Sequence, residues 1–230
     1  MKISRQFTSR DSVVDLVAQD YNILTLLSRF SIPLGFGNKS IGEVCRDSGI
    51  DVGLFLLVIN YTLTGEIDTR EMMKVSPIGI VNFLHNSHEY FLSYKIPHIR
   101  ANLLNALDDS HSDINPMIVS FFDQFIAKVA EHFSYEENTV FPYITSLMTG
   151  SPLRDYNIDI FRRHHDDVSD SLRELKNLIL RYYSTTRPDR MYDVLIDIYN
   201  CEDDIDSHSV IENNVLIPLI DSIESRYKSK

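Results

Sequence analysis

The sequence predicts an all-α protein, and three observations support that prediction. Apolar residues recur every three or four positions along most of the 230 residues, which is the spacing of one face of a helix. Glycines and prolines mark the ends of most of these periodic stretches, where helices stop. We find no run in which apolar and polar residues alternate as they would along a half-buried strand.

The first 66 residues are expected to form a small N-terminal domain of three helices. A break at Pro33, followed by two glycines, separates the first helix from the second. The polar, weakly periodic residues 66–76 indicate a linker after this domain. The three helices are predicted over 11–30, from Ser40 (in a capping-box pattern with Glu43) to about 48, and from Asp51 to about 65.

Residues 77–230 are expected to form an antiparallel four-helix bundle, because four long periodic stretches are joined by short connections. Pro77 suits the first turn of the first of these helices, and Pro97 is expected to kink the same helix. The four helices are predicted over about 77–107, 117–149, 158–183 and 189–225.

Two stretches of the predicted bundle carry one motif, in which His is followed by Glu four residues later and by Pro ten residues later. Residues four apart lie on one face of a helix, so each stretch aims an imidazole and a carboxylate in one direction. A single such pair is more often part of a solvated face, but repetition of the whole motif makes chance the weaker explanation. Adjacent residues point to different faces, so Glu137 is not expected to share the role. The two copies are His132, Glu136, Pro142 and His208, Glu212, Pro218.

The repeated motif predicts a metal centre inside the bundle. Imidazole and carboxylate ligands together suit iron, manganese, zinc or copper, and two carboxylates can bridge two ions. A cation would also offset the cost of placing the carboxylates against the apolar residues that flank both motifs.

Further ligands are expected among the other histidines. On the third bundle helix, His165 falls on the apolar face and is preferred to His164, because adjacent residues point about 100° apart. On the first bundle helix His88 is preferred, with His85 as an alternative or supporting ligand. From the residues alone, His111 lies in a loop and is expected to be solvated.

Charge and cysteine content narrow the function classes. The net charge of −11 disfavours nucleic acid and anionic membrane surfaces as partners, because both would repel the protein. The two cysteines do not form a disulfide framework, which favours a reducing cytoplasm. No apolar run reaches the roughly 18 residues that a membrane-spanning helix needs.

With these residues in place, the chain resembles the iron–sulfur cluster repair proteins, a hemerythrin-like di-iron family. The likeness covers nearly the full length and is most specific around the two motifs, including the run from Glu212 to Pro218. The resemblance implies two iron ions that are bridged by both glutamates and capped by histidines. On the first bundle helix Glu89 and His85 stay open as alternatives, because the spacing to Pro97 differs by about a residue from that of the family. The implied metal ligands are His88, His111, His132, Glu136, His165, His208 and Glu212.

The resemblance also implies a function, with one departure. It implies repair or protection of iron–sulfur clusters under nitrosative or oxidative stress, with damaged iron–sulfur proteins as partners. Redox chemistry on nitric oxide or oxygen, and a homodimer, are open under the same resemblance. Where the family carries an adjacent pair of cysteines, this chain has Pro33-Leu-Gly-Phe-Gly37, so a role that needs those thiols is not expected. The alternatives are a protein that binds or senses oxygen or nitric oxide, and a purely structural helical protein.

Overall fold

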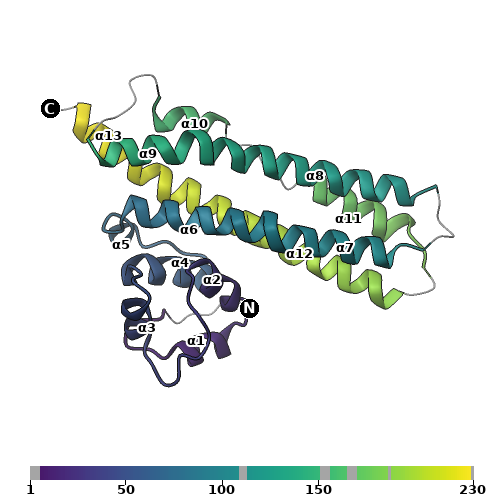
Figure 1. Ribbon diagram of the computed structural model, residues 1–230, viewed down its shortest axis with the longest axis horizontal. Helices are drawn as coiled ribbons and strands as arrows, with labels where there is room; N and C mark the ends of the chain where they lie inside the picture. The colour runs from purple at the N-terminus through teal and green to yellow at the C-terminus, as the bar shows by residue number, and fades with distance from the viewer. Residues whose placement is uncertain (1–5, 109–112, 151–155, 165–169, 186–187, 229–230) are drawn as a thin grey trace. The chain divides into compact units, whose positions relative to one another are not determined.

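The computed structural model describes residues 6–108, 113–150, 156–164, 170–185 and 188–228. Within these ranges the chain forms helices and no strand (Figure 1). The prediction of an all-α protein is confirmed. None of the helices in this described part is both long enough and apolar enough to cross a membrane.

Contacts between residues divide the chain into two compact units. Unit 1 comprises residues 1–87, 143–162 and 210–230, and unit 2 comprises residues 88–142 and 163–209. The unit boundaries at 87/88 and 209/210 fall inside helices, because α6 spans Pro77–Tyr90 and α12 spans Pro188–Ile211. The domain limits drawn from the sequence, 1–66 and 77–230, stay a prediction.

Unit 1 begins with five helices, one of which differs from expectation. The single helix expected over 11–30 is two helices, because Asp20 adopts an extended conformation with φ −151° and ψ 115°. The Asp20 carboxylate accepts a hydrogen bond of 2.9 Å from the backbone N–H of Asn22, a local turn that competes with the helix. The five helices are α1 (Val13–Gln19), α2 (Ile23–Arg29), α3 (Ile41–Asp47), α4 (Val52–Thr64) and α5 (Thr69–Met72).

The ends of α3 and α4 follow the capping signals of the sequence. Ser40 and Glu43 form the expected capping box at the start of α3. The Asp51 side chain accepts from the backbone N–H of Leu54 at 2.9 Å, and Gly65 ends α4 in the left-handed conformation with φ 75°. The segment expected to be only a linker contains α5, which has its own N-cap.

Unit 1 also contains the ends of several longer helices, which one buried carboxylate holds together. Its helices include α9 (Phe141–Met148) from Tyr143 on, α10 (Ile158–His164) up to residue 162, and α13 (Ile217–Lys228). Glu224 on α13 is 6% exposed. Its Oε1 accepts from the Tyr143 hydroxyl at 2.7 Å and from the backbone N–H of Ile158 at 2.8 Å. This carboxylate therefore links α13 to α9 and to the first turn of α10.

Unit 2 is a packed set of long helices with one apolar core. Helix α8 (Asn115–Tyr135) packs against α7 (Ile96–Ala106) and α11 (Asp170–Tyr182), and α12 lies alongside them (Figure 1). The core is rich in aromatic and branched side chains, and its fully buried members include Phe91, Phe122, Phe125, Phe133, Leu172, Leu175 and Ile198.

Charged pairs join the helices of unit 2 around this core. Two of them are surface pairs, and the third, between α11 and α12, has side chains only 8% and 12% exposed. They are Arg100–Asp123 (2.7 Å), Lys95–Asp197 (2.8 Å) and the buried pair Lys176–Glu202.

Three long helices each contain a π turn just before a proline. In every case the residue before the proline donates its backbone N–H to the carbonyl five residues earlier. A proline cannot donate a helical hydrogen bond, and its ring clashes with the carbonyl four residues earlier, so a wider turn relieves that contact. The kink expected at Pro97 is such a turn. The π turns are Phe91–Lys95, Glu136–Val140 and Glu212–Leu216.

Candidate metal centre

Four of the predicted ligands come together in the structure. One ligand atom from each of them lies within 4.8 Å of the ligand atoms of the other three. His88 lies near the end of α6 and His208 near the end of α12, and each glutamate is the first residue of a π turn. Their exposed fractions are close to zero: His88 4%, Glu136 0%, His208 2% and Glu212 0%.

Glu136 contacts imidazoles from two different helices. Its Oε2 lies 3.0 Å from Nε2 of His88, and its Oε1 lies 2.9 Å from Nε2 of His132. His132 precedes Glu136 by one helical turn, as the motif predicts, and its side chain is 9% exposed. The Nε2 atoms of His88 and His208 lie 3.2 Å apart. Three imidazoles therefore converge on one buried carboxylate and on one another.

The remaining predicted ligands fall into two groups. His111 and His165 lie outside the described residues. On α6, the alternatives to His88 are both exposed: His85 and Glu89 lie on the solvent side of the helix, whereas His88 is buried. Burial thus favours His88 among the three candidates that the sequence left open.

The residues present fit a metal ion. Where an imidazole nitrogen faces a carboxylate oxygen, or a second imidazole nitrogen, a proton or a cation has to lie between the two lone pairs. Glu136 meets this condition at both of its oxygens. A buried carboxylate costs several kcal/mol unless its charge is balanced, and imidazole with carboxylate is a donor set that iron, manganese and zinc accept.

Aromatic rings fix the plane of the His88 imidazole. The ring of Phe133 stacks on it with centroids 4.0 Å apart and an interplanar angle of 16°. The ring of Phe141 is stacked with it at 5.4 Å and 10°. Phe133 also contacts His208, with centroids 5.3 Å apart. These rings restrict the two imidazoles and keep water away from the carboxylate beside them.

The structure adds one residue that the sequence reasoning excluded. Nδ1 of His88 lies 2.7 Å from Oε1 of Glu137, whose side chain is 31% exposed. The two residues are 49 positions apart on different helices. The sequence carried a weak signal, because two acidic residues follow one another in the first motif, but the assumption of a regular α-helix turned Glu137 away from the site.

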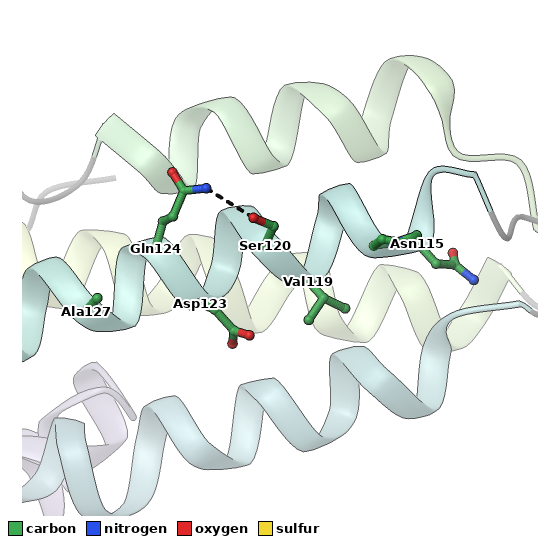
Figure 2. Close-up of a pocket in the computed structure, with 7 residues that line it drawn as sticks. Asn115, Val119, Ser120, Asp123, Gln124 and Ala127 are labelled. Carbon is green, nitrogen blue, oxygen red and sulfur yellow. Dashed lines mark hydrogen bonds between the residues drawn. The ribbon is translucent and has the colours of Figure 1, made fainter.

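A separate groove of about 760 Å³ lies along α8, away from these residues in the sequence. Figure 2 shows its labelled side chains on one face of the helix, where Gln124 donates to the Ser120 hydroxyl at 3.1 Å. None of its lining residues is a predicted ligand. They are Asn115, Pro116, Val119, Ser120, Asp123, Gln124 and Ala127.

Comparison with known proteins bears on the cluster directly. No curated protein matches the chain. The hemerythrin HHE cation-binding domain, a domain of helices that binds metal cations, matches residues 79–220. This match covers more than half of the chain, and it includes every histidine and glutamate of the cluster. Because both the fold and the match point the same way, the chain belongs to the hemerythrin HHE cation-binding domain family.

Proposed function

We propose that this protein holds two iron ions and acts in the cytoplasm in the repair or protection of iron–sulfur clusters under nitrosative or oxidative stress. The observation that carries the proposal is the buried cluster of histidines and glutamates on a repeated motif. Its partners would be damaged iron–sulfur proteins, with nitric oxide or oxygen as small ligands. The repair role itself rests on the resemblance of the whole chain to the repair family.

The geometry at Glu136 supports two ions rather than one. Its two oxygens face in different directions, Oε2 toward His88 on α6 and Oε1 toward His132 on α8. A carboxylate placed in this way can give one oxygen to each of two ions. Glu212, one turn after His208, is equally buried and would supply the second bridge.

Each of the chain's own residues would have a defined task in such a centre. His88, His132 and His208 would hold the ions through Nε2, and the two glutamates would balance their charge. Phe133 stacks on His88 and keeps the site dry. Iron, when bound, would supply one-electron redox chemistry and an affinity for small gaseous molecules.

Elemental analysis and an optical spectrum of protein purified without oxygen would test the proposal. We expect about two iron ions per chain, as in other bundles with carboxylate-bridged sites. Protein that has been offered ferrous iron and retains none, or that holds a single zinc ion instead, would contradict it.

The alternative is a protein that binds or senses oxygen or nitric oxide without repairing clusters. One observation favours it: Cys45 and Cys201, the only cysteines of the chain, are both buried, and the loop 33–37 carries no thiol. A function that passes electrons or nitrosyl groups through thiols has no accessible group for that step.

The two functions differ in what happens to a damaged partner. We would mix the reduced, iron-loaded protein with an enzyme whose iron–sulfur cluster has been damaged by nitric oxide, and measure the enzyme's activity. Recovery of activity supports repair. Absence of recovery, together with reversible spectral changes when the gas is added and removed, supports the binding function instead.

A further inference from the structure

We propose that Glu137 is a positioning residue, which holds the His88 imidazole by Nδ1 and fixes Nε2 as the nitrogen that faces the metal. This inference rests on the proposed metal-binding function. It concerns a carboxylate that faces away from the ions and acts through the histidine.

The contact between Glu137 and His88 is short and directional. Oε1 of Glu137 lies 2.7 Å from Nδ1 of His88, the distance of a charge-assisted hydrogen bond. A proton on Nδ1 leaves Nε2 as the ligand atom, because the hydrogen bond at one ring nitrogen sets the role of the other. Nε2 is the atom that lies 3.0 Å from Glu136 and 3.2 Å from His208.

Stacking alone does not select this orientation. The rings of Phe133 and Phe141 fix the plane of the imidazole, but a ring turned over by half a rotation occupies nearly the same volume and stacks equally well. A polar contact is what distinguishes the two orientations of a histidine ring. Glu137 supplies that contact.

The π turn explains how neighbouring carboxylates can serve one histidine. Glu136 and Glu137 are the first two residues of the π turn Glu136–Val140. This turn is wider than an α-helical turn, so successive side chains diverge less in direction. Glu136 therefore meets His88 on its Nε2 side and Glu137 meets it at Nδ1.

His88 needs support that the other histidines obtain within their own helices. His132 and His208 each precede the glutamate of their motif by four residues, whereas Ser87 occupies the corresponding position before Phe91. His88 lies one position later and has no glutamate one turn beyond it. The equivalent of Glu137 in the second motif is Asn213, an exposed residue whose neutral amide is a weaker acceptor. The supporting carboxylate is thus present only in the motif that faces His88.

Metal affinity in three full-length variants would test this role. We would compare Glu137→Ala and Glu137→Gln with Glu131→Ala, a matched control that removes an exposed carboxylate from the same helix. Fe²⁺ affinity would be measured without oxygen against a competing chelator, and Co²⁺ would serve as a probe whose absorption reports ligand geometry. Thermal unfolding of the metal-free variants would show whether the fold is intact.

We expect Glu137→Ala to lose roughly 10- to 100-fold in metal affinity, the usual effect of removing a carboxylate that orients a ligating histidine. Its Co²⁺ spectrum should shift, and its metal-free melting temperature should stay close to that of the wild type. Glu137→Gln keeps an acceptor oxygen and should recover part of the affinity. Glu131→Ala should behave as the wild type.

Three results would overturn the inference. Equal affinities and spectra for Glu137→Ala and the wild type would show that the contact has no effect on the metal. An equal loss in Glu131→Ala would show that only net charge matters, and a fall in metal-free stability with an unchanged Co²⁺ spectrum would show a structural role. A wild-type protein that binds neither Fe²⁺ nor Co²⁺ would overturn the proposed function as well, which distinguishes the two failures.

Discussion

Phe91 and Glu136 occupy the same place in two different helices. Each is the first residue of a π turn, and each lies six residues before a proline. Phe91 is fully buried and contacts His208 edge-on, with centroids 6.1 Å apart. The first bundle helix therefore carries an apolar version of the motif, in which an aromatic ring borders the site at the position where the other helices place a carboxylate.

Replacing Glu136 by alanine is expected to remove most of the bound metal, because both of its oxygens face imidazoles. Glu137→Ala should retain more, since that residue contacts a ligand rather than the ions. Metal content after dialysis against a weak chelator measures the difference. Equal retention by Glu136→Ala and the wild type would mean that the cluster is not the site.

The helix ends show how far the sequence could predict the fold. Capping residues gave the limits of α3 and α4 correctly, because Ser40, Asp51 and Gly65 act through local hydrogen bonds and backbone conformation. The break at Asp20 was missed, because an aspartate that accepts from the second residue after it is also common inside helices. Apolar periodicity continues through such a break and does not reveal it.

The site shows the same division between local and distant contacts. Spacing within one helix predicted that His132 meets Glu136, four residues later. The contact between His88 and Glu137 joins two helices and depends on a π turn, which a pattern with a regular helical period cannot represent. The prolines were recognised as part of the motif, but their consequence for the backbone was not.

Metal loading is expected to raise the melting temperature, because the ligands converge only in the folded protein. At a free metal concentration of 100 times the dissociation constant, binding adds about 2.7 kcal/mol to the free energy of unfolding. Thermal unfolding of iron-loaded and chelator-treated protein measures the shift. The same melting temperature in both samples would show that the folded chain has no preference for the metal over the unfolded chain.

Breaking the buried pair Lys176–Glu202 is expected to be costly in either single variant. Both side chains are nearly buried, and the Lys176 ammonium also lies 4.1 Å from the centre of the Tyr199 ring. Lys176→Met would leave a buried carboxylate without its partner, at a cost of about 3–5 kcal/mol. The double variant Lys176→Met with Glu202→Leu should regain most of that loss. Urea unfolding measures all three, and an additive double variant would contradict the pairing.

The pair Arg100–Asp123 is expected to give a small, pH-dependent contribution to stability. The hydrogen bond from Arg100 lowers the pKa of the Asp123 carboxyl. Stabilisation is therefore fully present above the unfolded-state pKa of about 4, and it is lost as the pH falls through the lower pKa of the folded state. Because the two side chains are 39% and 44% exposed, Asp123→Asn should cost less than about 1 kcal/mol at pH 7. Urea unfolding at several pH values would test this, and a cost that persists at low pH would contradict it.

The cysteines are expected to be unreactive in the folded protein. Burial raises the pKa of the Cys45 thiol to about 11, and the nearby Asp51 carboxylate raises it further, so little thiolate forms at pH 8. Cys201 is 1% exposed. A thiol reagent at pH 8 should therefore react slowly with native protein and rapidly after unfolding. If the metal centre alone carries the chemistry, iron-loaded Cys45→Ser with Cys201→Ser should react with nitric oxide as the wild type does. Rapid labelling of the native protein, or loss of the nitric oxide reaction in a double variant that retains its iron, would place a thiol in the mechanism.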